Sequence, residues 1–460
     1  MPDRPNLLYV FADQMRGSAL GCLGDEQART PHLDRLAAQG LAFRHAIANT
    51  PVCTPSRGSL LTGRHALACR CIANDLRLPE DERSIADELH DAGDRAAGYR
   101  TGYIGKWHLD GISRHMFTPP GPRRHGFDDY WAAYNCNHQY MDCRYYVDDD
   151  PELKREARYD ADVQTEQAIA FLERYRAEPF CLFLSWGPPH DPYRQVPQEF
   201  LDMYPPEEVA LRPNAEGANR AAIAGYYAHI TALDRNVGRL MAALDRLGLA
   251  EDTLVVFSSD HGDMLWSHGR LNKQQPYEES VRVPLIMRWP GRLPAGRVHL
   301  PTGEVRDTLI SVADYAPTFL GLLGQPVPEA MNGLDLSQVL LGRTRDEPTS
   351  VFINEYVSFD QARAYQPWRG VRTKRHTYAR WLQGGALLFD NQRDPYQMRN
   401  LLAEPGHEAL AAELEAELQG WLARLGDDFT TGEEHIRQLG QWEEWLIREE
   451  HFYGFRTSNF

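Results

Sequence analysis

The sequence predicts an α/β fold with a large, doubly wound, mostly parallel sheet, helices on both of its faces, and a smaller C-terminal antiparallel sheet with a packed helix. Two observations predict it. Short apolar runs with little polar alternation, typical of buried parallel strands, alternate with helical patterns through the first three quarters of the chain. After about residue 345, short strand-like runs follow one another between turns, as in antiparallel sheets.

Each element of the first part has a local signal. A helix over 33–39 is expected because Thr30-Pro31 suits a helix start and Gly40 a helix end. The proline-rich stretch 188–213 indicates a long surface loop. The remaining elements expected here are buried strands at 7–12, 182–186, 254–258 and 284–287, and helices at 160–176 and 219–247.

The C-terminal part divides into a small sheet and a tail. Strands are expected at 351–357, 370–373, 377–381 and 386–389, and a helix at 408–425 that Gly426 would end. Six aromatic residues in the last 19 are too many to leave in water, so the tail should cover its own active-site face or a second copy of the chain. The expected units are a large α/β domain over 1–345, a small α+β subdomain over 346–432 and an aromatic tail over 433–460.

Composition excludes several classes of protein. A net charge of −16 over 460 residues excludes a uniformly basic nucleic-acid-binding surface, although a local basic pocket is compatible with it. No apolar stretch is long enough to span a membrane. The apolar run 7–12 is shorter than a signal peptide and lacks a cleavage site, so we expect a first strand and a cytoplasmic location. Seven cysteines, an odd number, agree with a reducing compartment.

The most informative segment covers residues 51–64. Pro55 suits a helix start, which would place Cys53 at the positive end of a helix, where a thiol pKa falls and an anion is favoured. Arg57 would lie one helical turn from Cys53. The alternative is a buried structural cysteine beside a helix.

This segment resembles the sulfatase signature C-x-P-S-R…L-T-G-R, in which the cysteine is oxidised to formylglycine. Residues 98–109 resemble the second signature of that family. The similarity continues through 12–14, 30–34, 188–190, 259–262, 283–286 and 388–401, and so spans almost the whole chain. It implies an alkaline-phosphatase-like fold, a formylglycine-generating maturation enzyme as a partner, and hydrolysis of a small-molecule or saccharide sulfate ester.

The chemistry explains why an aldehyde is needed. A hydrated aldehyde offers two hydroxyl groups: one attacks sulfur, and a base deprotonates the other. Collapse to the aldehyde then expels sulfate without water attacking sulfur. A serine lacks the second hydroxyl and would be trapped as the sulfated enzyme.

The resemblance also implies a divalent-cation site. Its ligands would be modified Cys53 with Asp13, Gln14, Asp260 and His261, which follow two predicted strands at their carboxyl ends. For any one carboxylate the alternative is a helix cap or a turn. Many sulfatases have Asp-Asp at 13–14 and Asp-Asn at 260–261. Hard oxygen ligands favour Ca²⁺, which we expect, whereas an imidazole opens the site to Mn²⁺ or Zn²⁺.

The resemblance assigns the cationic residues as well. Arg57 orients the formylglycine, and Lys106 and Lys273 bind sulfate oxygens. His108 is the base on the hydrate, and His190, or Lys273 beside it, protonates the leaving oxygen. Lys106 and His108 are two residues apart, which puts them on one face of an extended segment. The alternatives are solvated lysines and hydrogen-bonded core histidines.

Two rival functions stay open. Phosphonate monoester hydrolases and choline-sulfatase-like members resemble the Gln14 and His261 version of the site, so a phosphonate monoester or phosphodiester hydrolase is one rival. A non-catalytic binding protein is the other, but it would need a damaged site.

Segment 134–140, rich in polar aromatics and amides, is either a pocket lining or a surface loop. Cys69 and Cys71 are expected to be plain thiols, because no second cysteine pair has zinc spacing.

Overall fold

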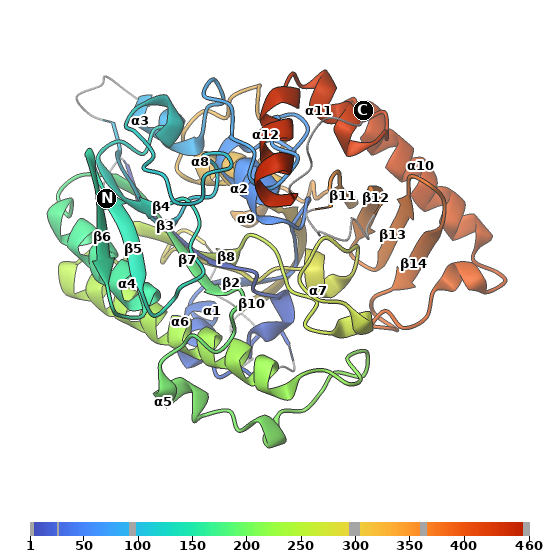
Figure 1. Cartoon of the computed structure of the whole chain (residues 1–460), viewed down its shortest axis with the longest axis horizontal. Coiled ribbons are helices and arrows are strands. Elements are labelled where there is room, and N and C mark those ends of the chain that lie inside the picture. Colours follow the sequence, from blue (N-terminus) through green and yellow to red (C-terminus); the bar gives the residue numbers. More distant parts are fainter. Residues whose placement is uncertain (1–3, 25–26, 92–97, 294–303, 359–365, 454–460) are drawn as a thin grey trace.

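A computed structural model of the protein describes residues 4–24, 27–91, 98–293, 304–358 and 366–453. These residues form a ten-stranded sheet covered by helices and a separate four-stranded sheet (Figure 1). The predicted fold class is confirmed. The strands of the large sheet are β1 (Asn6–Asp13), β2 (Leu41–Ile47), β3 (Arg100–Lys106), β4 (Tyr130–Tyr134), β5 (Cys143–Val147), β6 (Asp150–Glu156), β7 (Phe180–Pro189), β8 (Thr253–Ser259), β9 (Leu285–Arg288) and β10 (Glu304–Ser311). The helices around it are α1 (Pro31–Ala38), α2 (Cys53–Thr62), α3 (Ile85–Asp91), α4 (Asp160–Arg174), α5 (Gln198–Leu201), α6 (Arg220–Leu247), α7 (Glu278–Val281), α8 (Tyr315–Leu322) and α9 (Ser337–Leu340).

The large sheet has the strand order β10-β2-β9-β8-β1-β7-β3-β4-β5-β6. Its centre, from β8 to β4, is parallel, as the unbroken apolar runs predict. The predicted strand at 284–287 is present as β9, but it runs antiparallel to both of its neighbours. A short apolar run indicates burial on both faces and carries no information on strand direction.

The alternation of side chains along β1 divides the interior into two cores. Leu8 and Val10 face a core that also contains residues of α1, α4 and α6. Leu7, Tyr9 and Phe11 face the opposite core, with residues of α2, α3 and α8. Because β1 is buried on both faces, its carboxyl end lies in the middle of the molecule, where polar side chains are shielded from water.

The helix signals are largely confirmed. Asn219 caps α6 by accepting from the N–H groups of Ala221 and Ala222. Gly426 ends the helix over 408–425 with a φ of 64°. Thr30 precedes α1, but its hydroxyl donates to Asp34 (3.2 Å) instead of capping the helix.

The C-terminal part forms an antiparallel meander with one helix on its outer face. Its elements are β11 (Ser350–Glu355), β12 (Trp368–Thr373), β13 (His376–Trp381), β14 (Ala386–Asp390) and α10 (Glu408–Leu425), followed by α11 (Gly432–Gln438) and α12 (Trp442–Tyr453). Leu414, Leu418 and Trp421 of α10 pack on one face of the meander. Its other face meets the large sheet through Ile47 and Leu309.

The tail lies against the main body as two helices. Ile436 and Trp445 pack in one apolar cluster with Ala66, Ile72 and Leu76. Phe455 and Phe460, two of the tail aromatics, lie outside the described residues. Across the described ranges, no helix is long and apolar enough to cross a membrane.

Candidate active site

The predicted nucleophile begins a wholly buried helix. α2 starts at Cys53, which is 1% exposed, and ends where Gly63 takes a left-handed φ of 63°. The Cys53 Sγ lies 3.3 Å from His261 Nε2 and 3.8 Å from both Asp13 Oδ1 and Lys106 Nζ. Cys69 and Cys71 are also buried and form no disulfide, as expected of plain thiols.

Four of the five predicted metal ligands gather at the ends of two neighbouring strands. Asp13 ends β1, and Asp260 and His261 follow β8, which pairs with β1 in parallel. Ligand atoms of these three residues and Cys53 all lie within 4.8 Å of one another. His261 Nδ1 donates to the Gly262 carbonyl (2.9 Å), which leaves the Nε2 lone pair facing Asp13 (3.7 Å) and Asp260 (3.6 Å). Two carboxylates and an oriented imidazole fit a divalent cation.

Gln14, the fifth predicted ligand, lies beside this cluster with its side chain engaged elsewhere. Its Oε1 accepts a hydrogen bond from Lys273 Nζ, and its Nε2 donates to Asp263 (2.7 Å). Its backbone N–H donates to Asp260 Oδ1 (3.1 Å). Gln14 therefore connects the predicted metal ligands to Lys273.

Arg57 lies beneath the site. Its guanidinium, 1% exposed, donates to Asp13 and Asp260 (3.0 Å each) and to Ser185 and the Lys106 carbonyl (2.8 Å each). It is one turn from Cys53, as predicted. These contacts show that it aligns the two carboxylates.

The two carboxylates titrate differently. Burial and the neighbouring Asp13 raise the pKa of Asp260. Burial also disfavours ionisation of Asp13, but Lys106, His190 and Arg57 hold its pKa well below the usual range, and Lys106 Nζ lies 2.6 Å from it. A divalent cation would relieve the repulsion between the two buried acids.

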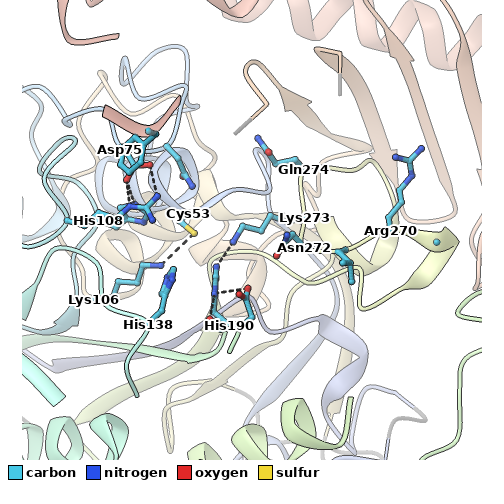
Figure 2. A pocket seen from close by; sticks show the side chains of 16 residues that line it. Cys53, Asp75, Lys106, His108, His138, His190, Arg270, Asn272, Lys273 and Gln274 are labelled. Carbon is cyan, nitrogen blue, oxygen red and sulfur yellow. Dashed lines mark hydrogen bonds and ion pairs between the residues drawn. The ribbon is translucent and has the colours of Figure 1, made fainter. Parts of the chain in front are cut away.

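A cavity of about 580 Å³ opens above Cys53 (Figure 2). Lys106, His108, His190 and Lys273 all line it, so the structure brings together five of the six predicted catalytic side chains. The predicted extended segment is wrong at His108. β3 ends at Lys106, and His108 has a left-handed φ of 55°, so the two side chains reach the cavity through a turn.

His108 has a partner that sequence reasoning missed. Its Nε2 lies 3.0 Å from Asp75, and Arg114 donates to both oxygens of the same carboxylate (2.8 Å each). Burial lowers the pKa of His108, but the negative charge of the Cys136 thiolate and the bond to Asp75 outweigh it and raise the pKa to about 9. Among the described residues, no hydrogen-bond partner faces the buried Nδ1.

His190 and Lys273 form a pair on the other side of Cys53. Lys273 Nζ lies 2.8 Å from His190 Nε2, and His190 Nδ1 donates to the Asp191 carbonyl (2.9 Å). Burial and the positive charge of Lys273 hold the pKa of His190 well below its usual range, so the ring is neutral and accepts from the lysine. His138 stacks on His190 at 4.4 Å and lines the cavity, which supports the pocket interpretation of segment 134–140.

The rim of the cavity comes from residues that no motif indicated. Arg270, Leu271, Asn272 and Gln274 line it on the loop that carries Lys273. Phe452 reaches it from α12, with its ring 4.7 Å from the Arg114 guanidinium. The aromatic tail was the one sequence signal that pointed toward this contact.

Known proteins resemble the chain over nearly its full length. Family models described as Sulfatase and as N-sulphoglucosamine sulphohydrolase, C-terminal, match residues 5–325 and 266–423. An ulvan-active sulfatase of Formosa agariphila is 40% identical over 445 residues, which cover 95% of this chain and 84% of the relative. The structure of yidJ from Bacteroides fragilis, assigned to the sulfatases, has 31% identity and a TM-score of 0.83, covering 93% and 97% of the two chains. The phosphonate monoester hydrolase SpPMH from Silicibacter pomeroyi shares the fold at 23% identity and a TM-score of 0.74, covering 93% and 96%.

Proposed function

Given that the chain belongs to the sulfatase family of sulfuric ester hydrolases, we propose that it removes a sulfate group from a saccharide, with residue 53 converted to formylglycine as its nucleophile. The observation that carries this proposal is the position of Cys53. Its Sγ lies on the cavity floor, 3.8 Å from both Lys106 Nζ and Asp13 Oδ1, where Lys106 would hold an anion next to a nucleophile. A saccharide is favoured because one matching family model is named for a sulfated glucosamine hydrolase.

The cluster around Cys53 fits a divalent cation, and Ca²⁺ remains our proposal. Asp13, Asp260 and His261 would hold it, with the oxygen of residue 53 completing the set. When bound, the cation supplies positive charge that lowers a hydroxyl pKa and attracts a sulfate oxygen. Arg57 keeps both carboxylates turned toward that position.

The chain's own residues account for the proton transfers. In its unprotonated form, His108 can hold its Nε2 proton toward Asp75 and accept the hydrate proton at Nδ1. Because its pKa is raised to about 9, the fraction that can act as a base grows as the pH rises toward that value. His190 is neutral and accepts from Lys273, so the proton available to the leaving oxygen is on Lys273 Nζ. Lys106, on the opposite side of Cys53, holds the anion.

The test is a substrate panel with one batch of metal-loaded enzyme whose residue 53 is shown by peptide mass spectrometry to be formylglycine. We expect kcat/KM to be higher for saccharide and aryl sulfates than for phenylphosphonate esters and phosphodiesters. All three classes carry one negative charge at pH 7, but the latter two bring a further substituent into the crowded space around Lys106 and Lys273. Activity on phosphonates or diesters with sulfates inert would contradict the proposal. Cytoplasmic location and dependence on a maturation enzyme remain predictions.

A further inference from the structure

A second cavity lies where the two sheets meet. Its volume is about 560 Å³, and we call it the junction cavity. The large sheet contributes Arg44 and His45 of β2, and the small sheet contributes Arg372 of β12 and the following Lys374. Glu278, Glu279 and Arg282, in and just after α7, and Arg212 complete its charged interior.

The floor of the junction cavity holds more positive than negative charge. Three guanidinium groups, those of Arg212, Arg282 and Arg372, face two carboxylates, those of Glu278 and Glu279. Arg372 donates to both oxygens of Glu278 (2.7 and 3.1 Å), and Arg282 lies 3.4 Å from the same carboxylate. Arg212 donates to Glu279 (3.2 Å). The floor therefore has one positive charge in excess, in a chain whose net charge is −16.

Two nitrogen atoms that matter for a ligand on this floor are buried without a hydrogen-bond partner among the described residues. One is Nη1 of Arg372, a residue that is 1% exposed, and the other is Nδ1 of His45, which is 7% exposed. Buried polar atoms of this kind are usually satisfied by protein, water or ligand, and His45 Nδ1 can donate to a ligand in the tautomer that carries its proton there. Burial and repulsion from Arg212 and Arg372 also lower the pKa of Arg282, despite the adjacent Glu278. Each of these features would be relieved by a negative charge in the cavity.

The mouth of the junction cavity is open to a ligand. The side chains of Arg44, Asp307 and Lys374 at its edge are 56%, 68% and 43% exposed. We propose that the junction cavity is a second anion-binding site, separate from the catalytic cavity, that takes a tetrahedral oxyanion through Arg372, His45 and the neighbouring arginines. The anion is either free sulfate or phosphate, or a sulfate group on a saccharide chain, since all present the same oxygens to a guanidinium group.

Isothermal titration calorimetry tests the proposal in a Lys273→Ala background, which weakens binding in the catalytic cavity. The probes are inorganic sulfate, inorganic phosphate and a sulfated disaccharide. We expect one site per chain for at least one probe. Arg372→Lys should weaken it by about tenfold or more, because lysine keeps the charge but loses the forked donors. Inorganic ions binding alone would identify a free anion, and the disaccharide binding alone would identify a substrate-borne sulfate.

His45→Phe is the second variant, because Arg372 also pairs with Glu278 and its replacement could destabilise the fold. Removing a histidine whose Nδ1 is unpartnered costs the fold little, yet it should weaken the same site by several-fold. Arg375→Gln is the matched control. Arg375 is a partly exposed cation near Lys374 that pairs with Asp390 and does not appear among the described residues lining the cavity. No probe binding at the second site, or equal binding in all three variants, would overturn the proposal. Turnover is not measured, so the result is independent of the proposed function.

Discussion

The floor and the rim of the catalytic cavity are built differently. The floor is formed by the ends of strands β1, β3 and β8 and by the start of α2, and its polar side chains bond to one another beneath the surface. The rim is formed by Arg114, the loop around Gln274, and Phe452 from the other end of the chain. Arg57 by itself makes four hydrogen bonds in the floor, whereas Phe452 packs its ring face against the Arg114 guanidinium. The floor is therefore suited to hold the reacting groups in one geometry. The rim is suited to contact the part of the substrate that carries the sulfate.

The largest effect should come from Cys53→Ser in the floor. Serine cannot provide the second hydroxyl, so turnover should fall by about 10⁴-fold or more and a sulfated enzyme should accumulate. Steady-state kinetics and intact-protein mass spectrometry measure both. Cys71→Ser, a buried cysteine outside the described cavity lining, is the control and should keep its activity. Normal turnover by Cys53→Ser would disprove the nucleophile.

The variants Asp260→Ala and His261→Asn, at neighbouring positions of the floor, should differ in how much metal they bind. Asp260→Ala should abolish metal binding and activity, because the cation loses a charged ligand and Arg57 loses a partner. His261→Asn should retain metal, because an amide oxygen replaces the ring nitrogen. Elemental analysis of the purified variants gives the answer, and full occupancy in Asp260→Ala would refute the assignment.

Asp75→Asn tests the boundary between floor and rim, because Asp75 bonds to His108 of the floor and Arg114 of the rim. We expect kcat to fall by about 10- to 100-fold, the usual effect of removing a partner that orients a functional histidine. The pKa of His108, raised to about 9 with the help of Asp75, should fall toward its usual value. Since a base works unprotonated, the pH at which activity rises should shift downward. An unchanged pH profile would argue against His108 as the base.

The smallest effect is expected in the rim. Phe452→Ala should raise KM for a saccharide sulfate by about two- to fivefold, through loss of the ring that covers Arg114. For a small aryl sulfate, which reaches only the floor, KM and kcat should hardly change. Phe452→Tyr, which keeps the ring, is the matched control. Equal effects on both substrates would show that the rim does not select the substrate.

The same contrast explains what the sequence could reveal. Asp13 and Asp260 lie in short local motifs at strand ends and Cys53 in one at a helix start, so these floor residues could be named before the structure. Asp75 and Arg114 acquire their roles only through contacts between loops 39 residues apart, for which no local pattern exists. In the fold, the apolar runs revealed β1, β7 and β8, whereas β6, whose residues are mostly exposed and polar, gave no strand signal.

Helix α12 links the last part of the chain to a segment made early in synthesis. Arg448, which is 1% exposed, donates to the Asn74 carbonyl (2.6 Å), and Glu444 accepts from the Arg77 N–H (2.8 Å). The helix is therefore hydrogen-bonded to the chain on both sides of Asp75. As the ribosome releases the chain, every floor residue up to Lys273 has emerged about 180 residues before Phe452. The residues of the cavity floor are therefore synthesised well before α12, which contributes Phe452 to the rim. A chain truncated before α12 would keep the nucleophile and the predicted metal ligands, but it would lose Phe452 and the two contacts that hold the segment around Asp75.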